Sequence, residues 1–164
     1  QVLKAVEYSA AGVDIDTAAD RLLESRHNMC QVFTVGNLKY LKRGGRISNL
    51  KAAVGTVLQI KPLLKGDPEG KIVCFGQVRG RKKSIEMMAE QYDRYVANAE
   101  CETIGIAHAD CPEDAEALIA LLNRRHPPKN IINACYEPMT GAHVGPDALA
   151  LFFYGKREFR AAVK

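Results

Sequence analysis

The chain has 164 residues, of which 47% are hydrophobic and 26% are charged, and its formal net charge is +4. This length suits one compact domain, and the hydrophobic content excludes a disordered chain. Because no apolar run is long enough to cross a bilayer and no signal peptide opens the sequence, we expect no integral membrane span.

Helix and strand signals alternate along the chain. In order, the predicted elements are helices over 2–11 and 14–27, a strand over 31–35, helices over 38–43 and from Ser48 or Asn49, strands over 60–64 and 71–78, a helix over 81–99, a strand over 103–107, a helix between 110 and 127, and strands over 131–136 and 148–154. The turn residues at 66–70 indicate that the second and third strands form a hairpin.

These elements define the fold class. A hairpin and two strand–helix–strand crossovers indicate a mixed sheet rather than a purely parallel one. We therefore expect an α/β (α+β) fold of two layers, a mixed six-stranded sheet with helices mainly on one face. The long helix over 81–99 should turn Ile85, Met88 and Tyr92 inward.

Basic residues are segregated in the sequence. No acidic residue lies between Glu24 and Asp67, a stretch that holds eight lysines and arginines, and a second basic group follows at 79–83. Such segregation implies one positive face and an anionic partner or ligand. The alternative is a solvated surface on which cations cluster by chance.

Two glycine-rich segments carry the best candidate residues. Arg43 and Arg46 flank Gly44 and Gly45, where uncovered backbone N–H groups can bind an anion, although a plain helix C-cap explains the glycines equally well. His143 stands between two glycines, where it is either presented to a ligand or is an ordinary turn histidine.

A third candidate lies at the end of a strand. Arg79 is placed where strand-end residues meet ligands in α/β proteins. The cations that follow it, at 81–83, begin a helix, where the helix dipole disfavours positive charge. They indicate either an anionic partner or ordinary solvated side chains that tolerate a small dipole cost.

The remaining signals point away from metal and nucleotide chemistry. Five single cysteines with no zinc spacing fit reduced thiols in a cytoplasmic protein. The sequence has no Walker phosphate loop, no dinucleotide fingerprint and no defensible catalytic triad. We therefore expect no metal, no cofactor and no catalytic residue.

Four ordered motifs resemble the DegV family. They are LKYLKRGGRI at 38–47, IKPLL at 60–64, VRGRKK at 78–83 and GAHVGP at 141–146, and their order and spacing agree from residue 1 to about residue 156. The resemblance covers the C-terminal half of that family. It implies that 13–164 form the lipid-binding domain and that 1–12 are a helix continuing from an N-terminal domain absent here.

The resemblance also implies a function and a site. DegV proteins bind a long-chain fatty acid with its carboxyl at the junction of two domains, and some present it to a fatty acid kinase that makes an acyl phosphate. By that similarity His143 should hydrogen-bond the carboxyl, Arg79 should support it, and Arg43 and Arg46 should dock the kinase. Leu50, Val54, Leu58 and Ile60 are candidates for the wall of an apolar tunnel, and each is equally consistent with an ordinary core residue.

One position departs from the family. The DegV pattern usually has glycine where this chain has Asp147, which either raises the pKa of His143 or faces solvent.

Two other functions stay open at this point. The basic face would also suit a nucleic-acid-binding or regulatory module, although aromatic content is only 7% and no recognition motif is present. The resemblance of DegV proteins in fold to dihydroxyacetone kinases raises the alternative of half an enzyme. An apolar patch left by the absent domain would favour a homodimer of this half.

Overall fold

The computed structural model describes residues 1–45 and 59–161, which contain a six-stranded sheet of strand order β3-β2-β1-β6-β4-β5. The strands are β1 (Met29–Thr34), β2 (Ile60–Gly66), β3 (Ile72–Arg79), β4 (Thr103–Ala109), β5 (Asn130–Cys135) and β6 (Ala148–Tyr154). β4 and β5 pair in parallel and the other neighbours pair antiparallel. The predicted six strands, the hairpin and the mixed sheet are therefore confirmed.

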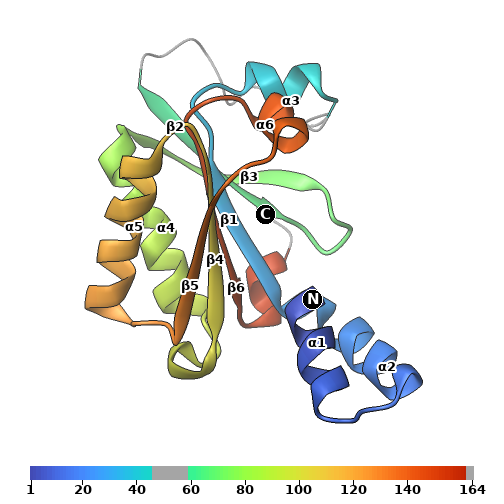
Figure 1. Cartoon of the computed structure of the whole chain (residues 1–164). Coiled ribbons are helices and arrows are strands. Elements are labelled where there is room, and N and C mark those ends of the chain that lie inside the picture. The colour runs from blue at the N-terminus through green and yellow to red at the C-terminus, as the bar shows by residue number, and fades with distance from the viewer. Residues whose placement is uncertain (46–58, 162–164) are drawn as a thin grey trace.

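The helices lie in three groups around this sheet (Figure 1). They are α1 (Val2–Ala10), α2 (Ile15–Ser25), α3 (Lys39–Arg43), α4 (Arg81–Tyr95), α5 (Pro112–Arg125) and α6 (Pro138–Val144), with short 3₁₀ turns η1 (Arg26–Asn28), η2 (Ala99–Cys101) and η3 (Arg157–Arg160). The long helices α4 and α5 lie side by side along one face, α3 meets α6 at one end of the sheet, and α1 packs on α2 near the other end. No helix in the described ranges has the length and apolar character that a membrane crossing requires.

The main core fills the space between the sheet and the helices α4 and α5. Alternate strand residues point to opposite faces, and the buried ones on this face include Val32 of β1, Ile106 of β4 and Leu151 of β6. They pack against helix residues such as Met88 and Leu118, as the amphipathic patterns predict.

A second, smaller core lies on the opposite face of the sheet. It is made by buried residues of the strands and of the segments around α3 and α6: Val35, Leu41, Leu64, Ala109, Val144 and Ala148. Because Leu41 belongs to α3 and Val144 to α6, this cluster fixes both short helices to the end of the sheet.

Two elements differ from the sequence prediction. α4 ends at Tyr95 rather than near residue 99, because Val96 takes an extended conformation and forms an isolated bridge with Gly155. α6 was not predicted, although its signals are present. Pro138 occupies the first turn, the side chain of Glu137 accepts a hydrogen bond from Thr140 N at 3.1 Å, and the helix is too short to show a periodic pattern.

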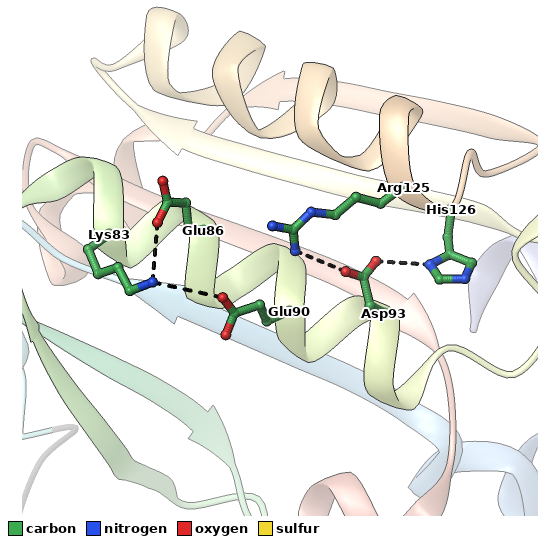
Figure 2. A network of polar contacts seen from close by, with 6 residues as sticks. All are labelled: Lys83, Glu86, Glu90, Asp93, Arg125 and His126. Atoms are coloured by element: carbon green, nitrogen blue, oxygen red, sulfur yellow. Dashed lines mark hydrogen bonds and ion pairs between the residues drawn. The ribbon is translucent and has the colours of Figure 1, made fainter.

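Polar contacts join the outer surfaces of α4 and α5 (Figure 2). Asp93 accepts from Arg125 at 2.9 Å and contacts His126 Nδ1 at 3.0 Å, so it ties the ends of the two helices together. Lys83 reaches Glu86 at 3.3 Å and Glu90 at 3.9 Å within α4. These pairs are solvent-accessible, and each contributes at most about 1 kcal/mol.

One buried polar atom in the main core gives a test of its packing. The Tyr92 hydroxyl is fully buried and has no hydrogen-bond partner among the described residues, and burial raises its pKa to about 12. Because an unsatisfied buried hydroxyl costs free energy, we expect Tyr92→Phe to raise the free energy of unfolding by about 1 kcal/mol in urea denaturation.

Ser84 provides the matched comparison for that substitution. It is equally buried, but its hydroxyl donates to Arg81 O at 2.7 Å. Removing this satisfied hydroxyl in Ser84→Ala should lower the free energy of unfolding by about 1 kcal/mol. A destabilised Tyr92→Phe protein would mean that the Tyr92 hydroxyl has a partner in solution.

Candidate functional site

The strand topology brings the predicted site residues to one end of the sheet. β1, β3, β4 and β5 end there, and β2 and β6 begin there. We call it the α3–α6 end, after the two short helices that meet at it (Figure 1). Arg79 is the last residue of β3, Arg43 is in the segment that follows β1, and His143 lies between β5 and β6. All three residues therefore belong to connections or strand ends at this end.

His143 lies in the last turn of α6, not in a turn as the glycines around it suggested. Its side chain is half-buried, and its Nδ1 lies against Gly44 at the end of α3. The helix is held at both ends. Glu137 caps its N-terminus, and Gly145 ends it with a φ of +76°, in the left-handed region that favours glycine. The imidazole is thus presented from a short, fixed helix.

Arg79 is exposed at the end of β3, where it pairs in register with Ile60 of β2. Its neighbour Val78 packs against the main core under α4 and α5. Since side chains alternate along a strand, Arg79 points to the opposite face, the one that α3 and α6 cover at this end. Arg79 and His143 therefore lie at the same end of the sheet and on the same side of it.

The other predicted residues are divided between described and undescribed parts of the chain. Arg43 is the last residue of α3 and is exposed, and Ile60, the first residue of β2, is half-buried. Four further candidates lie outside the described residues: Arg46, Leu50, Val54 and Leu58.

Two of the four cations in the second basic group, Arg81 and Lys83, pair with acidic residues of the same chain. Arg81 Nε lies 2.8 Å from Asp114 of α5, and Lys83 pairs with Glu86 and Glu90. Two of the three cations in the first turn of α4 therefore have acidic partners in the folded chain. Sequence reasoning missed this because the α5 partner is more than thirty residues away.

Asp147 has a backbone conformation that favours glycine, the residue that the resemblance led us to expect at this position. Its φ is +62°, in the left-handed region, which aspartate tolerates better than most residues. Its N–H donates to Ala109 O at 2.8 Å, and its carboxylate lies close to Gly36. The residue is exposed, in agreement with one of the two alternatives given for it, that it faces solvent.

Two of the five cysteines, Cys30 and Cys111, are buried packing residues. Burial raises the pKa of Cys30 to about 12, and burial likewise raises the pKa of Cys111. Both thiols are therefore protonated and unreactive at neutral pH. In the part of the chain that the structure describes, there is no cluster of three or more histidine, cysteine, aspartate or glutamate residues that could bind a metal ion.

Comparisons with known proteins agree with this fold. The profile of a family described as "Uncharacterised protein, DegV family" matches residues 1–156. A DegV domain-containing protein of Clostridium perfringens is 38% identical over 154 residues, which make up 94% of this chain and 53% of that protein. The chain spans about half the length of the curated relatives it matches.

Solved structures show the same half-length match. A fatty acid binding DegV family protein from Streptococcus agalactiae is 30% identical with a TM-score of 0.84, and the match covers 94% of this chain and 54% of that one. A DegV family protein from Thermus thermophilus, described for its fatty acid binding, is 26% identical with a TM-score of 0.85 and coverage of 94% and 55%.

Proposed function

The chain belongs to the DegV family, and from that premise we propose that it binds a long-chain fatty acid with the carboxyl group at the α3–α6 end of the sheet. The observation that carries the proposal is the placement of His143 and Arg79 at this end and on the same side of the sheet. The solved DegV structures most relevant to it are described as fatty acid binding.

The energetics of a fatty acid require both an apolar tunnel and a polar mouth. Burying a tail of sixteen carbons gains on the order of 10 kcal/mol, at about 0.8 kcal/mol per methylene. A carboxylate left without partners would cancel much of that gain. An imidazole N–H and a guanidinium are the donors that suit it, which gives His143 and Arg79 their proposed roles.

We propose further that the bound acid is presented to a fatty acid kinase and that the protein is itself a binding protein rather than a catalyst. Arg43 is exposed beside the proposed mouth and suits the docking of an acidic partner surface, with Arg46 as its proposed companion. Ile60, beside Arg79 in the β2–β3 register, is a proposed part of the tunnel wall together with Leu50, Val54 and Leu58.

Native mass spectrometry of the protein in its full natural length, purified from bacterial cells, tests the proposal. We expect a mass increment of one long-chain fatty acid, lost on delipidation and restored one-to-one by added palmitate or oleate. A delipidated protein that takes up neither acid would contradict the proposal.

The competing functions have their own readouts in the same preparation. If the basic residues served nucleic acid, binding to DNA or RNA would appear at low salt and fall steeply as salt is added. The pairing of Arg81 and Lys83 with acids of this chain favours a flat titration instead. ATP turnover by the protein without a partner would support the enzyme alternative.

A further inference from the structure

α3 and α6 meet through two rings that rest on two glycines. A Cβ atom built on Gly44, the C-cap of α3, would lie 2.6 Å from Nδ1 of His143. A Cβ atom built on Gly145, the C-cap of α6, would lie 2.2 Å from the ring of Tyr40. The ring of His143 in α6 thus packs against the C-cap glycine of α3, and the ring of Tyr40 in α3 packs against the C-cap glycine of α6. Side chains at 44 or 145 would force the facing ring to move, because real Cβ contacts are not closer than 3.0 Å.

The two glycines of the Gly44–Gly45 pair have different reasons to be glycine. Gly45 has a φ of +67° and open space around it, so its backbone requires glycine. Gly44 has a φ of −75°, which any residue can adopt. What excludes a side chain at position 44 is the imidazole of His143.

The contact also determines which edge of the imidazole is covered. Nδ1 and Cε1 of His143 lie 2.6 and 3.4 Å from the Cβ position of Gly44. The next nearest atom is Tyr40 O at 3.5 Å, so Nε2 of the ring lies farther away. Nε2 is therefore the ring nitrogen farther from the Cβ position of Gly44.

We infer that Gly44, together with the Tyr40–Gly145 contact, positions the imidazole of His143 so that Nε2 serves the ligand. Resting on the proposed function, this makes Nε2–H the donor to the fatty acid carboxylate, which requires the Nε2-protonated tautomer or the imidazolium. Gly44 then acts on the ligand through His143.

Gly44→Ala in the full natural chain is the direct test. We expect the displaced imidazole to weaken binding of palmitate by about ten- to a hundredfold, since small displacements of a positioned group cost that much. Binding of hexadecanol, which has the same tail without a carboxylate, should change little. Gly141→Ala is the matched control, because residue 141 lies in α6 two positions from His143 and has no atom within 4 Å of its Cβ position.

A second readout needs no ligand. In the delipidated protein, the ¹⁵N resonances of the His143 ring should shift in Gly44→Ala and stay unchanged in Gly141→Ala. Equal losses of palmitate and hexadecanol, or an unshifted His143 ring, would overturn the positioning role. If the wild-type protein binds no fatty acid but Gly44→Ala still shifts the His143 resonances, the proposed function is wrong. The contact between Gly44 and His143 is then still established.

Tyr40→Leu keeps the test informative if Gly44→Ala does not fold. It removes the ring from Gly145 without adding atoms beside His143. We expect the His143 resonances to shift in the same direction as in Gly44→Ala and palmitate affinity to fall by a smaller factor. Unchanged resonances and affinity in this variant would also overturn the inference.

Discussion

Replacing His143 by alanine is expected to weaken the binding of a long-chain fatty acid by about ten- to a hundredfold. A hydrogen bond to a charged group contributes about 1.5–3 kcal/mol, which corresponds to that range of affinity. The imidazole is half-buried at the α3–α6 end, so water replaces it only in part. Calorimetric titration of the delipidated protein measures the loss, and formation of acyl phosphate with the proposed kinase partner should fall with it.

His126→Ala is the control for that substitution. His126 follows α5 at the opposite end of the sheet and contacts Asp93 on the surface. Its removal should leave fatty acid affinity unchanged. Unaltered binding and unaltered acyl-phosphate formation in His143→Ala would remove His143 from the site.

Phe153→Ala is expected to lower the free energy of unfolding by about 3–5 kcal/mol, the usual loss for a buried phenylalanine. Phe153 is 1% exposed and makes edge-to-face contacts with Tyr92 at 5.2 Å and Phe159 at 5.7 Å. It therefore joins the central strand β6 to both α4 and η3. Guanidinium denaturation followed by circular dichroism measures this loss, which is a large share of a typical domain's stability.

Phe152, the neighbouring residue on β6, tests whether the loss of stability depends on which face of the sheet the side chain occupies. Phe152 points to the opposite face, where it is half-buried and lines a shallow pocket of about 220 Å³ with residues such as Leu3 and Ile132. We expect Phe152→Ala to cost about 1–2 kcal/mol, in proportion to its smaller burial. Equal losses for the two variants would contradict the assignment of the main core to the α4–α5 face.

Local patterns were sufficient for the strands and for the long helices, because these carry strong periodicity and clear turn residues. The β2–β3 hairpin followed from the turn residues at 66–70, and the inward face of α4 followed from Ile85, Met88 and Tyr92. The end of α4 was placed too late, because the bridge between Val96 and Gly155 is a tertiary contact that local propensity does not contain.

The candidate site was less predictable, since its geometry depends on segments a hundred residues apart. His143 was identified from the sequence. The helix that contains His143 and the contact between its ring and Gly44 were not predicted. The same limit applies to Arg81, whose unfavourable place at a helix start is compensated by Asp114 only after α4 and α5 have packed. Residue types indicated the chemistry, and long-range packing supplied the arrangement.

The position of β6 also bears on how this protein is made. β6 is the last strand of the described sheet in sequence, and it lies between β1 and β4 at the centre. Until residues 148–154 have left the ribosome, β1–β3 and β4–β5 are two separate sheets. The edges of β1 and β4 that later pair with β6 have no strand beside them. The sheet therefore closes only after residues 148–154 have been synthesised, and until then the backbone groups that pair with β6 are exposed on β1 and β4.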